Sequence, residues 1–169
     1  RSHGITSDGT KMFPRPAAEI WNYQQISLGF NYRMTDIHAA LGTSQMARLD
    51  AYVDRRNELA ERYDDLLQPL TVHTPWRHPN TRSSFHLYVI QLDRTKPIPP
   101  RRAVFESLRA GGIGVNVHYI PVHLQPDFQS LGFSKGDFPR AEAYYEEAIS
   151  IPLYPGLTAE GQARVVSTL

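Results

Sequence analysis

One long helical tract constrains the fold more than any other stretch of this sequence. Between residues 36 and 67, apolar side chains recur at steps of three and four, the spacing of one face of an α-helix. Thr35 is a suitable N-cap, and Asp36 places a negative charge in the first turn, where the helix dipole favours it. Gly42 and the polar residues after it weaken the tract. We therefore expect a break between Gly42 and Asp50, and two helices.

The remainder of the chain alternates between short strands and helices. β-Branched and aromatic residues predict the strands, and caps, prolines and glycines delimit the helices. We expect strands over residues 71–73, 84–92, 114–120 and 149–153, and helices over residues 101–110, 126–131 and 138–148, followed by a last helix. Asp137 and Thr158 are the expected caps of the last two helices. This order predicts an α/β fold, with a short sheet and helices on one side.

The first 30 residues show no periodic pattern, and we expect them to be irregular. Their second part carries large apolar side chains that require burial, namely Trp21, Tyr23, Ile26, Leu28 and Phe30. A loop of this length is uncommon within a self-sufficient domain. The chain also begins without a methionine and stops within a helical pattern. We therefore expect it to be a piece of a longer protein.

Composition argues against several classes of function. The formal net charge is +1, which disfavours nucleic-acid binding by bulk electrostatics. No apolar run approaches the roughly 20 residues that span a bilayer, and no signal peptide is visible. The chain has no cysteine, so it forms no disulfide or thiolate metal site, which suits a reducing compartment. We therefore expect a cytoplasmic protein with no nucleic-acid or membrane partner.

A histidine-containing segment is the first candidate for chemistry. His118, Tyr119 and His123 lie at the end of an expected strand. One interpretation is a metal site, but its third ligand would have to be His86 or Asp127, at no characteristic spacing, so we expect no metal. The alternatives are a half-buried structural histidine, and a cluster of side chains that hydrogen bonds a polar small molecule.

The loop before the long helical tract carries a second candidate. Asn31 and Arg33 offer donors at a helix start, an arrangement that binds anions in many proteins. In an extended loop the two side chains point to opposite sides, and could hold two anions, or one anion and one carbonyl. Ordinary loop polarity explains them equally well. The glycines at 111–114 follow a helix and precede a strand, the wrong order for a dinucleotide-binding motif.

Several motifs together resemble one family along nearly the whole chain. They are RSHG at residues 1–4, GFNYRMTD at 29–36, AALG at 39–42, FHLY at 85–88, GIGV at 112–115, HYIPVH at 118–123 and ISIPL at 149–153. This set resembles the second half of the sugar-nucleotide aminotransferases, the DegT/DnrJ/EryC1/StrS family. The start of the chain and residues 114–119 are most similar to the branch of that family that serves pseudaminic-acid synthesis.

The resemblance implies a fold, a cofactor and an assembly. It implies the C-terminal portion of a fold-type-I transferase that depends on pyridoxal phosphate. Residues 1–48 would be the end of the large cofactor domain and a linking helix, and residues 49–169 a small C-terminal α/β domain. The enzyme would be a homodimer with composite active sites. Its reaction would transfer an amino group from glutamate to C4 of a UDP-linked 4-keto-6-deoxy sugar.

The resemblance also implies roles for single residues. Asn31 would reach across the dimer to the phosphate of the neighbour's cofactor. Arg33 would lie beside it and engage the carboxylate of the amino donor or ketoacid, for which the planar guanidinium fork is well suited. His118, Tyr119 and His123 would line the sugar-nucleotide side of the site.

The lysine that forms the Schiff base in this family has no counterpart in the sequence. Lys11, Lys96 and Lys135 are the only lysines, and none lies in the family's sequence context. The chemistry needs an activated amine. We therefore expect the catalytic lysine upstream of Arg1, no catalytic residue in this chain and no activity from the chain alone. The alternative is a non-catalytic module that keeps the small-domain fold and binds a nucleotide sugar.

Overall fold

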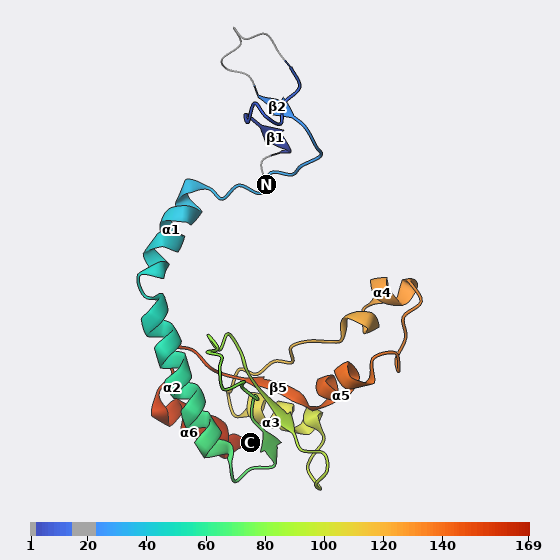
Figure 1. Cartoon of the computed structure of the whole chain (residues 1–169). Coiled ribbons are helices and arrows are strands. Elements are labelled where there is room, and N and C mark those ends of the chain that lie inside the picture. The colour runs from blue at the N-terminus through green and yellow to red at the C-terminus, as the bar shows by residue number, and fades with distance from the viewer. Residues whose placement is uncertain (1–2, 15–22) are drawn as a thin grey trace. The chain divides into compact units, whose positions relative to one another are not determined.

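The computed structural model describes residues 3–14 and 23–169. They fall into two compact units, residues 1–48 and residues 49–169 (Figure 1). No helix within the described ranges is long and apolar enough to cross a membrane.

In the part of the first unit that the structure describes there are a pair of short strands and a helix: β1 (Ile5–Thr6), β2 (Gln24–Gln25) and α1 (Asp36–Met46). The two strands are antiparallel. The amide of Gln24 extends their pairing, because its Oε1 accepts from the Phe13 nitrogen (2.8 Å) and its Nε2 donates to the Phe13 carbonyl oxygen (3.0 Å). The prediction that residues 1–30 are irregular is therefore wrong at this pair of strands. Strands of two residues form few backbone hydrogen bonds, and the Gln24 side chain adds two more.

Helix α1 begins as predicted. The Thr35 hydroxyl accepts a hydrogen bond from the His38 backbone nitrogen (3.3 Å), and Asp36 lies in the first turn. The helix ends at Met46, and the next helix begins at Leu49. The predicted break in the helical tract is confirmed.

Large apolar side chains of the first unit are exposed. Leu28 is 87% exposed and Phe30 61%, although the Phe30 ring stacks on that of Tyr32 with 5.7 Å between centroids. Helix α1 buries none of its residues. The burial expected for these side chains is therefore not found within this unit, and Trp21, for which burial was also expected, lies outside the described residues.

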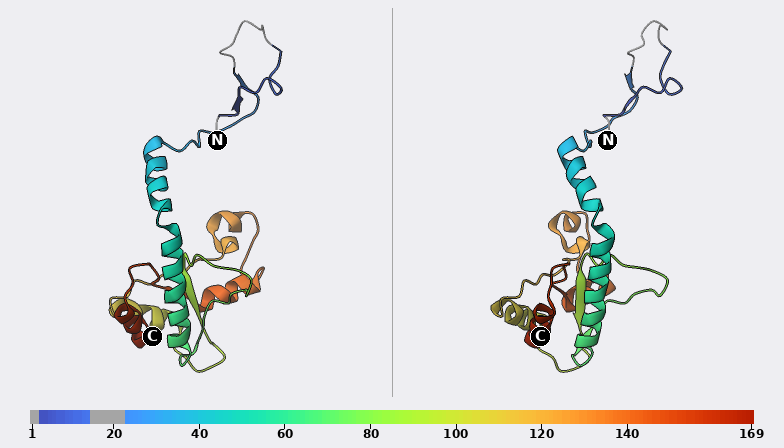
Figure 2. Two further views of the ribbon diagram at one scale, coloured as in Figure 1. Left: turned by 60° about the vertical axis from the view of Figure 1, so that its left-hand side comes forward. Right: turned by 90° about the vertical axis from the view of Figure 1, so that its left-hand side faces the viewer.

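The second unit is a three-stranded sheet with helices: α2 (Leu49–Leu67), β3 (Val72–His73), β4 (Tyr88–Leu92), α3 (Arg101–Ala110), the 3-10 helix η1 (Val122–Leu124), α4 (Pro126–Ser130), α5 (Pro139–Glu147), β5 (Ala148–Ile151) and α6 (Ala159–Thr168). The strand order is β3-β4-β5, and both pairings are antiparallel. Helix α6 lies beside α2, and the segment with η1 and α4 projects away from the sheet (Figure 2).

One hydrophobic core fills the space between the sheet and three helices. Alternate residues of β4 point into this core, and Val89 and Gln91 between them are only half-buried. The core also takes side chains from α2, α3 and α6, and its central members are Leu59, Tyr63, Leu67, Tyr88, Ile90, Leu92, Leu108, Ile149, Ile151 and Val165. Helices α2, α3 and α6 therefore pack on one face of the sheet, and α5 also contacts β4, where its Glu147 accepts from the Gln91 side chain (3.3 Å).

Side-chain hydrogen bonds tie α2 to distant parts of the chain. The Arg56 guanidinium donates through Nη1 to the carbonyl oxygens of Phe85 (2.7 Å) and Leu153 (3.2 Å). The Gln162 amide, fully buried on α6, donates to the carbonyl oxygen of Leu59 (2.8 Å). The two Arg56 bonds satisfy carbonyls that lie outside regular elements, and the Gln162 bond adds a side-chain donor to a carbonyl within α2.

Two of the predicted helix ends are confirmed and one cap is wrong. Helix α3 stops at a glycine pair, where Gly112 has a φ of 73° and the Ile113 nitrogen reaches back to the Leu108 carbonyl oxygen (2.9 Å). Thr158 caps α6 through the Gly161 nitrogen. Asp137 does not cap α5, because its carboxylate instead accepts from the Ser134 nitrogen (2.7 Å) and closes the preceding turn.

All four expected strands are shorter than predicted, and two of them differ by more than one residue in length. The strand expected over residues 114–120 is reduced to a single bridge between Asn116 and Ser150, because the Asn116 Oδ1 accepts from the Val117 nitrogen (2.8 Å) in place of a strand partner. The strand expected from Ser84 begins only at Tyr88. Phe85, with a φ of 46°, interrupts it.

Candidate functional site

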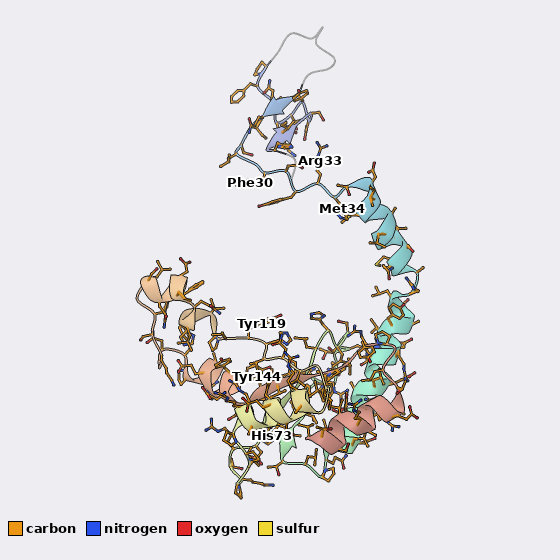
Figure 3. All side chains as sticks on the ribbon, turned by 180° about the vertical axis from the view of Figure 1, so that it is seen from behind. Phe30, Arg33, Met34, His73, Tyr119 and Tyr144 are labelled. Carbon is orange, nitrogen blue, oxygen red and sulfur yellow. The ribbon has the colours of Figure 1, made fainter. Side chains whose placement is uncertain are left out.

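The loop between β2 and α1 presents donors. The Arg33 backbone nitrogen donates to the Asn31 side-chain oxygen (3.3 Å). Because a backbone N–H can only donate, the atom it meets must be the amide oxygen, which leaves the Asn31 Nδ2 as the outward-facing donor. Arg33 is also exposed and carries donors only. Figure 3 shows Arg33 on this loop, between Phe30 and Met34. Two neighbouring donor groups of this kind suit a phosphate or carboxylate.

His118 and Tyr119 lie together in the second unit. Their rings meet edge to face with 4.7 Å between centroids. His118 is half-buried, and both of its ring nitrogens have protein partners: Nδ1 lies 2.7 Å from the Ser150 hydroxyl oxygen and Nε2 lies 3.2 Å from the Asn116 side-chain nitrogen. Tyr119 is 69% exposed. The Tyr119 hydroxyl is therefore the more accessible polar group of the pair.

His123 belongs to a different cluster. It is only 6% exposed, its Nε2 lies 2.8 Å from a carboxylate oxygen of Glu142, and its ring packs on that of Phe138. His123 and His118 therefore have different hydrogen-bond partners. Only Nδ1 of its two ring nitrogens is left to contact a ligand.

A metal site at these histidines has no support in the geometry. Asp127 and His86 are both exposed. Across residues 3–14 and 23–169, no three His, Cys, Asp or Glu side chains gather closely enough to hold an ion. The two histidines of the segment instead use their nitrogens on Asn116, Ser150 and Glu142.

Beside His123 lies an apolar recess of about 340 Å³. Its lining consists of aromatic and aliphatic side chains on the segment that projects from the sheet, namely Pro121, Val122, Phe128, Phe133, Phe138 and Ala141, together with His123. Glu142 fastens this segment, because the same carboxylate oxygen that meets His123 also accepts from the Gly136 nitrogen (2.7 Å). One carboxylate therefore joins η1, the turn before α5 and α5 itself.

The hydrogen bonds from the Gly136 nitrogen and the His123 ring hold the pKa of the Glu142 carboxyl below its ordinary value of 4.5. A lowered folded-state pKa means that the charged carboxylate stabilises the folded segment above pH 4.5. This contribution is lost as the pH falls through the lower, folded-state pKa.

We expect the Gly136 amide proton to report this titration. In an acid titration followed by NMR, its chemical shift should change with a midpoint below 4.5, and its protection from hydrogen exchange, relative to the intrinsic rate at each pH, should fall once Glu142 is protonated. In Glu142→Gln both pH-dependent changes should disappear. A midpoint at or above 4.5 in the native chain would contradict the role of the Glu142 carboxylate in joining η1, the turn before α5 and α5.

The three lysines lie in places that do not activate an amine. Lys11 is exposed and pairs with Asp8 in a turn (3.2 Å). Lys96 and Lys135 are exposed on loops. A lysine nucleophile needs an environment that shields its amine from water, and these three lysines are exposed.

Sequence reasoning missed three residues of these clusters: Asn116, Ser150 and Glu142. Two of them left a signal. Ser150 is the one polar residue in the apolar strand β5, and Asn116 lies two positions before His118, within side-chain reach. Glu142 left no such signal, because only the folded chain brings it to His123.

Comparison with known proteins identifies a matching family and similar sequences. The sequence model of the DegT/DnrJ/EryC1/StrS aminotransferase family matches residues 1–169. An uncharacterized protein of Methanocaldococcus jannaschii is 36% identical over 173 residues, which cover 100% of this chain and 44% of that protein. The spore coat polysaccharide biosynthesis protein SpsC of Bacillus subtilis is 38% identical over 152 residues, covering 88% and 39% of the two chains.

Solved structures agree with this result. A Streptococcus pneumoniae protein assigned as a sugar aminotransferase superposes in its apo-form with a TM-score of 0.83 at 30% identity, over 99% of this chain and 39% of that one. The same protein is known in forms with PMP and PLP. Helicobacter pylori PseC, an aminotransferase involved in the biosynthesis of pseudoaminic acid, gives a TM-score of 0.77 at 28% identity, over 99% and 42%.

The chain thus spans about two fifths of the length of the relatives that it matches. The predicted fold class is confirmed: the α/β arrangement, with its short sheet and flanking helices, agrees with the C-terminal portion of an aminotransferase that uses pyridoxal phosphate. Since the family model matches along the entire sequence, the chain belongs to the DegT/DnrJ/EryC1/StrS aminotransferase family.

Proposed function

We propose that this chain is the C-terminal portion of an enzyme that transfers an amino group from glutamate to C4 of a UDP-linked 4-keto-6-deoxy sugar. The observation that carries the proposal is the match of the entire chain to a family of aminotransferases. The likeness to H. pylori PseC supports the pseudaminic-acid branch as the source of the sugar. The enzyme would work in the cytoplasm, in keeping with a sequence that lacks cysteine.

The cofactor of the proposed enzyme is pyridoxal phosphate, which supplies the carbonyl group that carries the amino group between donor and acceptor. The donors of this chain fit such a group. Asn31 presents its Nδ2 because its oxygen is held by the Arg33 nitrogen, so it can donate to the cofactor phosphate without adding charge. Arg33 offers a planar fork for the carboxylate of glutamate.

The proposed active site is composite. Asn31 and Arg33 serve the site of the neighbouring subunit in a homodimer, and the cofactor-binding lysine comes from a segment upstream of Arg1. Support for this division comes from the exposed positions of all three lysines and from the exposed apolar side chains of the first unit, which other protein would cover.

The sugar-nucleotide side of the site is formed by His118, Tyr119 and His123. Tyr119 is the exposed donor of this group, and His118 lies against it with its ring fixed by protein partners. His123 contributes through the apolar recess beside it and through its Nδ1. Together these residues would bind and orient the nucleotide sugar, and exclude water from it.

The test is an assay of the full-length protein with pyridoxal phosphate, glutamate and a UDP-linked 4-keto-6-deoxy-N-acetyl sugar. A 4-amino sugar nucleotide and 2-oxoglutarate are the expected products, in equal amounts. Failure of the full-length dimer to bind the cofactor would overturn the proposal. Tight binding of UDP-sugars by the 169-residue chain alone, with no turnover in the full-length protein, would instead favour a non-catalytic binding module.

A further inference from the structure

A chain of hydrogen bonds runs through the side chains of three residues that are close in space. The Val117 backbone nitrogen donates to the Asn116 Oδ1 (2.8 Å). The Asn116 Nδ2 lies 3.2 Å from the His118 Nε2, and the His118 Nδ1 lies 2.7 Å from the Ser150 hydroxyl oxygen. Every polar atom of the His118 ring therefore has a protein partner.

The direction of this chain is fixed at its start. The Val117 N–H can only donate, so the Asn116 atom that it meets must be the amide oxygen and the other end must be the NH₂ group. That NH₂ group can also only donate, and the His118 Nε2 must therefore accept. A neutral imidazole whose Nε2 accepts carries its proton on Nδ1, and this proton is donated to the Ser150 hydroxyl.

Backbone pairing holds both ends of the chain in place. Ser150 and Asn116 form the isolated bridge, in which the Ser150 nitrogen donates to the Asn116 carbonyl oxygen (2.8 Å) and the Asn116 nitrogen to the Ser150 carbonyl oxygen (3.3 Å). Ser150 is 5% exposed. Its neighbours Ile149 and Ile151 point into the core, so its hydroxyl lies on the opposite side of β5.

We propose that Asn116 and Ser150 are positioning residues that hold His118 as the neutral Nδ1–H tautomer, with its ring fixed against Tyr119. Since both ring nitrogens are used within the chain, His118 offers a ligand its ring surface and no hydrogen bond. The Tyr119 hydroxyl is then the group that hydrogen bonds the substrate. This last step rests on the proposed function, whereas the tautomer does not.

The tautomer is tested on the 169-residue chain labelled with ¹⁵N-histidine, by NMR at a mildly alkaline pH where imidazoles are neutral. The expected spectrum shows the His118 Nδ1 protonated and Nε2 unprotonated, the tautomer that free histidine disfavours. In Ser150→Ala the Nδ1–H loses its acceptor, and the shifts should move towards the averaged values of an unconstrained ring. Ser150→Thr keeps a hydroxyl and should restore the native pattern.

Asn116→Asp tests the other end of the chain. One carboxylate oxygen can still accept from the Val117 nitrogen, and the other now faces the His118 Nε2, which should become protonated. Asn80→Asp, which adds the same charge at an exposed loop position, should leave the His118 pattern unchanged. A protonated Nε2 in the native chain, or a pattern that neither variant alters, would overturn the assignment.

Kinetics of the full-length protein test the substrate step separately. Tyr119→Phe should raise KM for the nucleotide sugar by about tenfold, the scale of one lost hydrogen bond, with KM for glutamate unchanged. If the NMR pattern is as expected and KM for the nucleotide sugar stays native in an active Tyr119→Phe enzyme, the tautomer assignment is kept and the substrate role of Tyr119 is rejected. Absence of activity in the native protein would refute the proposed function, not the tautomer.

Discussion

In the full-length dimer, Arg33→Ala is expected to lower kcat/KM for glutamate by roughly 10- to 100-fold. Hydrogen bonds to charged groups contribute about 1.5–3 kcal/mol each, and about 1.4 kcal/mol corresponds to a factor of ten. Alanine removes the guanidinium fork that would hold the donor's carboxylate. The measurement is the single-turnover rate of the glutamate half-reaction as a function of glutamate concentration, compared with the rate for the nucleotide sugar, which should change little.

Two further arginine variants test whether the loss comes from the guanidinium of Arg33 and not from removal of any exposed arginine. Arg33→Lys keeps the charge but not the planar fork, and should lie between the native protein and Arg33→Ala. Arg102→Ala removes a side chain that is 88% exposed and pairs with Glu106 on α3, so the rate should stay native. An unchanged glutamate dependence in Arg33→Ala would remove Arg33 from the site and leave ordinary loop polarity as its explanation.

Tyr63→Ala is expected to lower the free energy of unfolding of the second unit by about 3–5 kcal/mol, the cost of truncating a large core aromatic. Tyr63 is completely buried, and its ring meets that of Tyr88 at 5.1 Å between centroids. Its hydroxyl donates to the Pro152 carbonyl oxygen (3.0 Å), and burial raises the pKa of that hydroxyl, so it stays protonated. Urea unfolding followed by circular dichroism measures the change.

The matched variants divide the loss between ring and hydroxyl. Tyr63→Phe keeps the ring and leaves the Pro152 carbonyl oxygen without its donor, for an expected cost of about 1 kcal/mol. Tyr144→Ala removes a half-exposed tyrosine on α5 and should cost less than about 1 kcal/mol (Figure 3). A loss for Tyr63→Ala no larger than that for Tyr144→Ala would contradict the central place given to Tyr63 in the core.

The helices of this chain were predictable because their determinants are local. Helix α3 has the predicted bounds, Arg101–Ala110, since prolines precede it and a glycine pair follows it. Thr35 and Thr158 cap the helices that they were expected to cap, because an N-cap bond reaches only three residues along the chain. Asp137 had an equally suitable position, but its carboxylate accepts from the Ser134 nitrogen instead.

The strands were less predictable, because side chains compete with strand partners for backbone groups. Asn116 sits among β-branched residues that favour a strand, yet its own amide takes the next backbone N–H. At Phe85 the backbone nitrogen bonds the Ser83 hydroxyl and the carbonyl oxygen bonds Arg56, so neither group joins the sheet. Hydrophobic pattern alone does not reveal such bonds.

The candidate site was predictable in part. The sequence indicated donors at Asn31 and Arg33, and the structure adds the turn that orients the Asn31 amide. The roles of these residues, and those of His118, Tyr119 and His123, stay predictions. The partners Ser150 and Glu142 are 32 and 19 residues away from the histidines that they contact, and only the folded chain brings them together.

The long-range bonds of α2 have a consequence for synthesis of the protein. Arg56 binds a carbonyl 97 residues later, and Gln162 reaches back 103 residues to Leu59. Closing loops of that size has a large entropic cost that is recovered only when the late partners are present. On the ribosome, α2 therefore emerges long before it can dock, with Leu59, Tyr63 and Leu67 exposed to solvent and to chaperones. We expect the second unit to become stable only after residue 162 has left the exit tunnel.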